Sequence, residues 1–438
     1  MASIRNFNHY RSVGYSHNLR WLIVVASLVC GGALTTEAAA DPPTVLEEIV
    51  VTASLRPAPA SEVPASVTVL DAALLRSAGL QHFADVVGLV PNLNWSGGTS
   101  RPRYFQLRGV GELEQYQGAP NPSVGFLIDD IDFSGVGMPA TSFDVDQVEV
   151  LRGPQGTRYG ANALAGLINI RTTDPLPERE LRTELTAAED GMTGVALVAG
   201  GAVDLAGDES GAWRFAAQQA HSDGFRRNRY LGRDDTNARD ELTLRGKLRV
   251  QPRAGWQVDL AALYADLDNG FDAFAPDNSF DTLSDRPGRD AQRASGASAK
   301  VAVDLVAASL LSTTAFASSD SVYSFDGDWG NDAYWGEFAP YDYFSRYSRE
   351  RGTLSQDLRI TSDATARDDG FGWLAGVYAL RLDEDTLQRD EFAGELLRPL
   401  LASAYDALNL AAYGEAEWRV AGDLVLAAGL RVERWSAD

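Results

Sequence analysis

The C-terminal part of the chain is the feature that most constrains its fold, because β-prone segments fill residues 181–433 without a long helical pattern. Each segment is about ten residues long, and many alternate small or apolar side chains with polar ones, which is typical of strands with two different faces. Eleven strands are predicted, over residues 181–188, 194–203, 212–221, 241–250, 256–266, 297–305, 309–318, 353–362, 372–382, 410–420 and 424–433.

The connections between these segments alternate in length. Those after the even-numbered strands are short, such as 251–255 and 421–423, whereas several after odd-numbered strands are long, such as 267–296 and 319–352. Short turns at one end and long loops at the other are typical of an outer-membrane β-barrel. A soluble β-sandwich also alternates along its strands, so the pattern alone leaves both mainly β folds open.

The predicted loop 319–352 is rich in aromatic residues set among acidic ones. Such rings suit ligand capture by stacking and cation–π contacts, but they equally suit a loop that packs on itself or anchors at a membrane interface. The candidate ligand contacts are Trp329, Tyr334, Trp335, Tyr341 and Tyr343.

Composition excludes several classes of function. The net charge of -23 over 438 residues argues against a nucleic-acid partner. Cys30 is the only cysteine and the chain has four histidines, so neither a metal site nor a disulfide framework is expected. No arrangement of nucleophile and base is apparent, and neither an enzyme nor a cofactor is predicted. Only Lys247 and Lys300 are lysines; the remaining basic residues are arginines.

The N-terminus has the pattern of an export signal. Three arginines precede an apolar stretch over residues 21–34, and Ala38-Ala39-Ala40 follows it. A basic region, an apolar region and an A-x-A site predict a signal peptide over residues 1–40 that is cleaved after Ala40. The alternative of a membrane anchor is disfavoured, because no apolar run reaches the ~18 residues of a spanning helix.

A short β-prone run, Leu46–Ala53, follows the signal peptide and is succeeded by three prolines at 57, 59 and 64. A strand of this kind without its own sheet can pair with the edge of a partner's sheet. An ordinary first strand is the alternative.

Along residues 55–175 the sequence predicts a strand, then two short helices, then several strands, which together make a small α+β domain. Asp71 is the expected N-cap of a helix over 72–77 that ends near Gly79, and Pro91 is expected to end a second helix that starts near Phe83. Three aspartates at 129, 130 and 132 suggest a polar hairpin turn, with a cation site as the alternative. The pair Gly109 and Gly111 does not make a nucleotide loop, because Glu114 occupies the third glycine position.

Several stretches of this region resemble TonB-dependent outer-membrane receptors. They read EEIVVTA (47–53), VPASVTVL (63–70), LRGVG (107–111), PSVGFLIDDI (122–131), FDVDQVEVLRGPQGTRYG (143–160) and NALAGLINI (162–170). The resemblance implies a TonB box segment over 41–54, a plug domain over 55–175 and the N-terminal part of a transmembrane antiparallel β-barrel over 176–438. Asp130 departs from the family pattern, which usually has glycine there.

The resemblance also implies roles for individual residues. A TonB-type energy-transducing protein in the periplasm would bind Glu47, Glu48, Ile49, Val50, Val51, Thr52 and Ala53. Arg108 and Arg152 would pair with acidic residues on the inner barrel wall and hold the plug there as a latch.

The implied function is energised uptake of a scarce substrate across the bacterial outer membrane, in contact with its lipid. A ferric siderophore, a metal chelate, is the first substrate class expected, and an oligosaccharide or cobalamin is the alternative. Eleven strands are half of the twenty-two that large barrels of this kind have. The sequence is therefore expected to be a fragment or a truncated product, and a surface protein that binds without transporting is a further alternative.

Overall fold

The computed structural model describes residues 50–53, 56, 58–63, 65–96, 98–113, 120, 122–155, 163–204, 210–363, 370–397, 401–421 and 424–438. The predicted signal peptide and residues Glu47, Glu48 and Ile49 lie outside the described residues. No helix in the described part of the chain is both long and apolar enough to cross a membrane.

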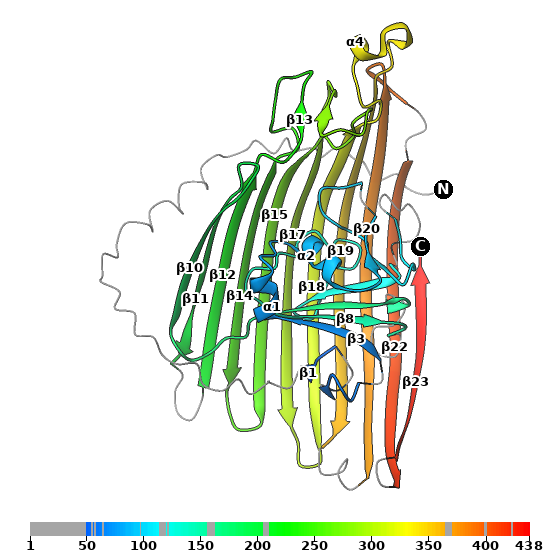
Figure 1. Ribbon diagram of the computed structural model, residues 1–438. Coiled ribbons are helices and arrows are strands. Elements are labelled where there is room, and N and C mark those ends of the chain that lie inside the picture. The colour runs from blue at the N-terminus through cyan, green and yellow to red at the C-terminus, as the bar shows by residue number, and fades with distance from the viewer. Residues whose placement is uncertain are drawn as a thin grey trace, which may run out of the picture. The chain divides into compact units, whose positions relative to one another are not determined.

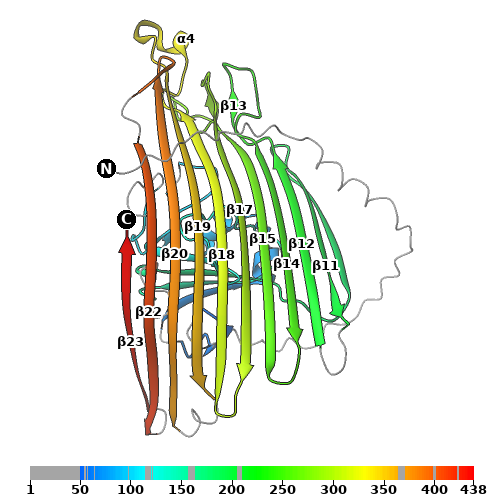
Figure 2. The same cartoon turned by 180° about the vertical axis from the view of Figure 1, so that it is seen from behind.

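A large antiparallel sheet dominates the fold (Figures 1 and 2), and eleven of its strands follow one another both along the chain and across the sheet. These are β10 (Glu180–Ala187), β11 (Thr193–Val203), β12 (Ser210–Ser222), β14 (Arg239–Gln251), β15 (Trp256–Phe271), β17 (Gly288–Asp304), β18 (Ala308–Asp326), β19 (Tyr343–Ser362), β20 (Phe371–Phe392), β22 (Leu401–Ala421) and β23 (Leu424–Ala437). The eleven predicted strands are all present. The short β21 (Glu395–Leu396) pairs with β20 beside this path.

Several strands are longer than predicted at the end that carries the long loops. β18 continues to Asp326 and β19 begins at Tyr343, so the predicted loop 319–352 was too long. Alternation is visible only where one face of a strand is apolar, and about ten residues cross a bilayer. Beyond that length both faces of these strands are polar or aromatic, and the pattern is lost. The shorter connection contains α4 (Asp332–Trp335) and the 3₁₀ turn η5 (Gly336–Phe338).

The plug region forms a five-stranded sheet in the order β3-β8-β9-β6-β7, with only β6 and β9 parallel. Its strands are β3 (Ser66–Asp71), β6 (Val124–Ile128), β7 (Ile131–Asp132), β8 (Val145–Arg152) and β9 (Gly166–Thr172). Its helices are α1 (Ala72–Ser77), α2 (Phe83–Val86) and the 3₁₀ turn η3 (Val87–Leu89). The small α+β domain predicted from sequence is thus present.

Short two-stranded pairs complete the described elements. They are β1 (Val50–Val51) with β2 (Ala58–Pro59), β4 (Leu93–Asn94) with β5 (Gln106–Leu107), and β13 (Arg227–Asn228) with β16 (Asp281–Thr282).

Local signals in the plug act as the sequence predicts. The carboxylate of Asp71 accepts a hydrogen bond from Leu74 N and caps α1. Asp129 and Asp130 both have positive φ, 49° and 67°, in the tight turn between β6 and β7. This confirms the hairpin interpretation, because aspartate tolerates the left-handed conformation better than most residues.

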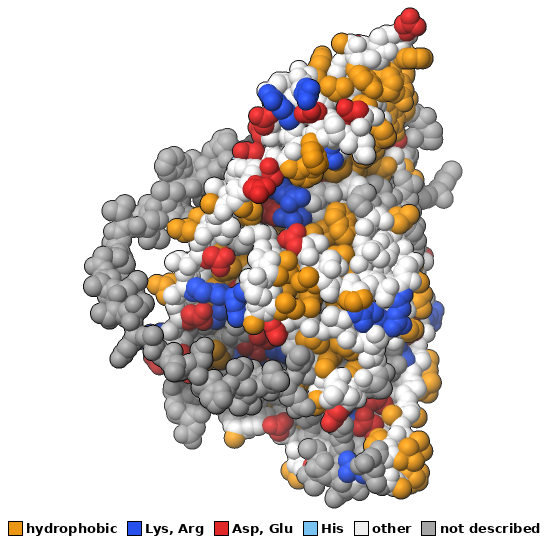
Figure 3. Space-filling model, viewed as in Figure 1, with side chains coloured by type: hydrophobic (Ala, Val, Ile, Leu, Met, Phe, Trp, Pro, Cys, Tyr) orange, Lys and Arg blue, Asp and Glu red, His pale blue; other side chains and the backbone are white. Residues whose placement is uncertain are grey.

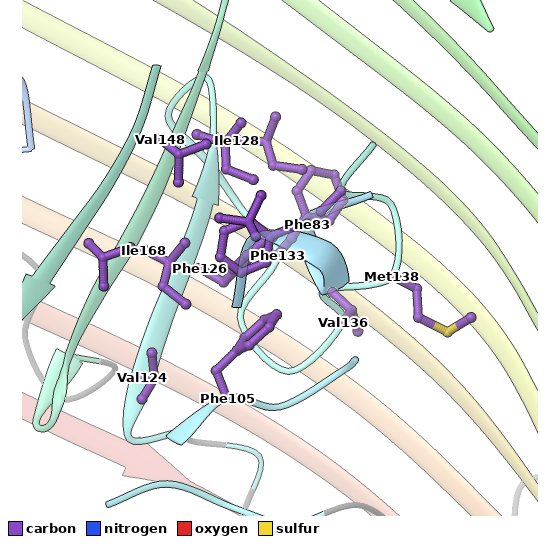
Figure 4. Close-up of a cluster of buried hydrophobic side chains, with 14 of the residues drawn as sticks. Phe83, Phe105, Val124, Phe126, Ile128, Phe133, Val136, Met138, Val148 and Ile168 are labelled. Atoms are coloured by element: carbon purple, nitrogen blue, oxygen red, sulfur yellow. The ribbon is translucent and has the colours of Figure 1, made fainter. Parts of the chain in front are cut away.

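The plug core packs directly against the inner face of the large sheet. Phe105 stacks on Phe126 at 5.1 Å between ring centroids, and Phe83 meets both edge-on (Figure 4). The same hydrophobic cluster includes small residues of the large sheet, which we call the wall: Ala265, Ala294, Ala315 and Ala317. Gly296 on β17 allows this close approach, because a Cβ there would lie 2.8 Å from Ile131 and 2.9 Å from Phe133.

The opposite face of the large sheet exposes bulky apolar side chains. The exposed set includes Leu181, Leu185, Val195, Leu260, Phe316, Leu354, Val377, Leu410 and Leu426. Figure 3, which views the molecule from the side of the plug, shows hydrophobic side chains along the right-hand edge as well, where β22 and β23 lie. Large exposed apolar patches are uncommon on soluble monomers, so this face is suited to lipid.

Candidate functional site

The described end of the predicted TonB box is folded into the plug rather than free. Val50 and Val51 form β1 against β2, and the Val51 side chain is fully buried. Val51 and Ala53 belong to a hydrophobic cluster that also contains Leu127 and Leu167. Residues 50–53 are therefore ordered, and they must leave this site before they can pair with another sheet.

Glu149, on β8, is the residue that binds this end of the box. Its carboxylate is fully buried. Thr52 N and Thr52 Oγ1 donate to its Oε1 (2.8 and 2.7 Å), and Ala53 N donates to its Oε2 (2.7 Å). Gln147 Nε2 and Asn169 Nδ2 donate to the same carboxylate. Hydrogen bonds to an ionised acceptor are stronger than neutral ones, so this clasp holds the box end firmly.

The predicted latch arginines lie together in the plug. Arg152 donates to Pro91 O (3.1 Å), Ser66 Oγ (2.9 Å) and Thr68 Oγ1, all plug atoms. Burial and the neighbouring Arg108 lower the pKa of Arg152. Among the described residues, no carboxylate of the large sheet pairs with Arg108 or Arg152, and their latch role remains a prediction.

The described ion pairs between plug and wall are made by other residues. Arg101 donates two hydrogen bonds to Glu241 on β14 (2.7 and 2.8 Å), with both side chains largely buried. Arg103 pairs with Asp290 on β17, which also accepts from Ser100 N (2.6 Å) and Ser100 Oγ (2.7 Å). These arginines could not be singled out from the sequence, because they lie in an irregular stretch and their partners follow 140 and 187 residues later.

The aspartate turn of the plug contacts both lysines of the chain. Lys247 Nζ lies 2.8 Å from Asp129 Oδ1, and Lys300 Nζ lies 2.8 Å from Asp130 Oδ2. The cations beside this turn are thus side chains of the wall. Among the described residues, no group of three or more His, Cys, Asp or Glu side chains is placed to hold a metal ion.

The predicted ligand contacts divide into two groups. Trp335 meets Tyr334 and Tyr341 edge-on (5.1 and 4.9 Å) and donates its Nε1 to Asp328 (3.2 Å). This group packs on itself, which was one of the alternatives. Trp329 instead stacks on Phe274 at 5.4 Å. Tyr343 is the first residue of β19, where its backbone N donates to Asp328 Oδ2 (2.9 Å).

A second aromatic group, which the sequence did not single out, continues from Phe274 toward the plug. The ring centroid of Phe271 lies 5.0 Å from that of Tyr323, and the Tyr323 centroid lies 6.1 Å from that of Tyr347. The guanidinium of Arg103 sits 5.7 Å above the Tyr323 ring. Phe271, Tyr323 and Arg103 are buried, whereas Trp329 is exposed, so a flat or aromatic ligand can reach this aromatic group at Trp329.

Comparison with known proteins agrees with this architecture. Residues 59–167 match the family model of the TonB-dependent receptor plug domain. The pesticin receptor of Yersinia pestis is 37% identical over 131 residues, 29% of this chain and 19% of that protein. The vitamin B12 transporter BtuB of Vibrio vulnificus (strain YJ016) is 24% identical over 334 residues, 72% of this chain and 52% of that protein.

Solved structures share the fold. The ferric yersiniabactin uptake receptor FyuA of Yersinia pestis superposes with a TM-score of 0.69 at 19% identity, covering 86% of this chain and 62% of that one. A structure of P. aeruginosa FpvA bound to a heterologous pyoverdine gives 0.69 at 18% identity, covering 89% and 54%. The chain therefore spans less than two thirds of the length of each of these relatives.

Proposed function

We propose that the chain is a TonB-dependent receptor, which imports a scarce substrate across the outer membrane with energy supplied by a TonB-type protein in the periplasm; the match of residues 59–167 to the plug-domain family supports this. The observation that carries the proposal is the clasp of Glu149 on Thr52 and Ala53. It keeps a strand-forming segment away from a partner sheet until the hydrogen bonds to Glu149 break. The apolar outer face of the large sheet supports a location in membrane lipid.

In the proposed mechanism, substrate shifts an equilibrium between two states of the box. Substrate binds at the end of the sheet with long loops, where Trp329 exposes its ring and stacks on Phe274. It must bind the state with a released box more tightly than the clasped state, since only differential affinity can shift the populations. The partner then pairs with residues 47–53 as an added strand and pulls on the plug. No covalent step is involved, in keeping with relatives that are transport receptors.

We propose a ferric siderophore as the substrate. The exposed ring of Trp329, stacked on Phe274, suits a chelate with flat aromatic groups. Receptors for ferric yersiniabactin and for pyoverdine are among the proteins with this fold. Cobalamin is the second candidate, because the similarity to a vitamin B12 transporter extends over most of the chain.

Deleting residues 47–53 tests the proposal. Energised uptake of ferric chelates by an iron-starved strain should be lost, while binding of the same chelates to intact cells is retained. Labelled cobalamin, tested in parallel, separates the two substrates. Binding without uptake in the undeleted protein would instead identify a surface-binding protein, and uptake that survives the deletion would rule out coupling through the box.

A further inference from the structure

Three cationic side chains alternate on the inner face of β14 and all meet the plug. Arg245 donates to the carbonyl oxygen of Phe143 (2.6 Å). Lys247 donates to the carbonyl oxygen of Thr172 (2.7 Å) in addition to its pair with Asp129. Arg249 Nη2 lies 3.1 Å from Asp174 Oδ2. Because alternate residues of a strand point to one face, these cations form a column directed at the plug.

Two further strands of the sheet, β17 and β19, add cations around a cavity of about 480 Å³. Lys300 on β17 and Arg359 on β19 line the cavity, together with Lys247 and Arg249. We call Arg245, Lys247, Arg249, Lys300 and Arg359 the wall strip. The strip lies toward the end of the sheet with short connections, and Thr52 of the box also lines the cavity.

Plug carboxylates neutralise the wall strip in this state. Four cations of the strip line the cavity, where the wall supplies two carboxylates, Asp259 and Asp304. Two cations keep partners on the wall, because Arg249 pairs with Asp259 and Arg359 lies 3.9 Å from Asp357. The plug supplies Asp129, Asp130 and Asp174, which make the close contacts to Lys247, Lys300 and Arg249. It also supplies two cations, Arg56 and Arg171, which leave with it. If the plug turn moves away, the wall keeps an excess of positive charge that faces the vacated space.

We propose that the wall strip is a transit site for an anionic substrate, which replaces the plug carboxylates as the partner of the strip when the plug moves. The inference rests on the proposed function and narrows its substrate to a chelate or conjugate with net negative charge. Separating Lys247 and Lys300 from Asp129 and Asp130 in a confined site is costly, so an anion that takes over from the two aspartates lowers the barrier to plug displacement.

The use of lysine at the two central contacts supports exchange of partners. Of 38 basic residues besides histidine, only Lys247 and Lys300 are lysines, and both contact the aspartate turn. An ammonium group is a hydrated point charge on a flexible stem, whereas a guanidinium holds a carboxylate in a fixed two-pronged geometry. Lysine is therefore the better choice where one carboxylate must leave and another anion must enter.

A charge exchange tests this inference. Lys300→Asp combined with Asp130→Lys keeps an ion pair between plug and wall in the closed state but reverses the charge that the wall retains. The matched control exchanges another pair that includes a β17 residue, Arg289→Asp with Asp268→Arg; that pair is 2.7 Å apart, half exposed and absent from the cavity lining.

Uptake is measured for a ferric tris-catecholate, which is an anion, and a ferric tris-hydroxamate, which is neutral. The Lys300/Asp130 exchange should reduce the ratio of anionic to neutral uptake by roughly fivefold or more, since two unit charges change within a few ångströms of the path. The control exchange should leave the ratio unchanged.

A second readout needs no identified substrate. A cysteine in place of Ala302, which lines the cavity, is labelled with anionic or cationic thiol reagents in a Cys30→Ser background. In cells with the energising partner, the anionic reagent should be favoured over the cationic one, and the exchange should reverse that preference. Without the partner, both proteins should show the same ratio.

The two readouts separate this inference from the function on which it rests. Labelling that depends on the partner but is insensitive to the exchange overturns the transit site and leaves the proposed function standing. Labelling and uptake that are both independent of the partner overturn the two together.

Discussion

Glu149→Gln should release the box end without substrate. Both carboxylate oxygens accept a backbone N–H, from Thr52 at Oε1 and from Ala53 at Oε2. Glutamine keeps the shape of the side chain, but its NH₂ group must face one of these two backbone donors, so one of the two backbone hydrogen bonds is lost in either orientation. A hydrogen bond to a charged group contributes about 1.5–3 kcal/mol, and we take about 2 kcal/mol as the loss.

A change of about 2 kcal/mol raises the population with a released box roughly 30-fold, because each 1.4 kcal/mol is a factor of ten. The assay is the affinity of the purified receptor, without substrate, for the periplasmic domain of its TonB-type partner. Apparent affinity scales with the fraction of receptor that is competent to bind, so it should rise by about the same factor.

Glu112→Gln is the matched control, since Glu112 accepts from Ser123 N (2.9 Å) and Ser123 Oγ (2.7 Å) elsewhere in the plug. It should lower thermal stability to a similar degree without changing partner affinity. Equal partner affinity for wild type and Glu149→Gln would refute the clasp. A rise of the same size in Glu112→Gln would show that general loosening of the plug, rather than the clasp, controls the box.

Three further predictions concern the plug and the loop that connects β18 to β19. Arg101→Ala should lower the free energy of unfolding by about 3–5 kcal/mol in chemical denaturation, because it leaves Glu241 buried without its partner. Burial and Arg101 lower the pKa of His82 to about 3, below 6.5 in the unfolded chain, so unfolding takes up a proton below pH 6.5. Lowering the pH from 7 to 5 should then cost about 2 kcal/mol, a loss that His82→Asn removes. Trp335→Ala should weaken substrate binding about tenfold in equilibrium titrations. It removes the ring contacts with Tyr334 and Tyr341 and the hydrogen bond to Asp328, which together order the loop between β18 and β19.

Each of these has its own check. Arg101→Met with Glu241→Leu should recover most of the lost stability, and a double variant as unstable as the single one would contradict the cost of an unpaired charge. Asparagine at position 82 can still cap α2, so an unchanged pH dependence would mean that other groups cause it. If Trp335→Ala binds normally while Trp329→Ala does not, the ligand contacts Trp329 directly and the order of the loop is irrelevant.

The strands could be predicted because lipid imposes a simple rule on each of them. Residues such as Leu181, Leu185 and Leu260 face outward, and small or polar residues face inward, so alternation marks the part of each strand that lipid surrounds. The outer ends of β18 and β19 obey no such rule, and Tyr323 and Phe325 were consequently assigned to a loop.

The site was harder to predict, because its contacts join residues far apart in the sequence. Glu149 lies between two valines of β8 and looks like an ordinary polar residue of a strand; only its contact with Thr52, 97 residues earlier, reveals the clasp. The rarity of lysine was visible from the sequence, but its meaning depends on the register that brings Lys247 and Lys300 to the turn at Asp129 and Asp130. The family resemblance located the box and the plug, but it could not identify the partners of individual side chains.

The most direct test of the account is amide hydrogen exchange at Thr52 and Ala53 in membrane-reconstituted receptor, with and without a substrate that it binds. Slow exchange in the free protein and a marked acceleration with bound substrate are the predicted results. Equal protection in both states would mean that substrate does not release the box end, and coupling through Glu149 would have to be abandoned.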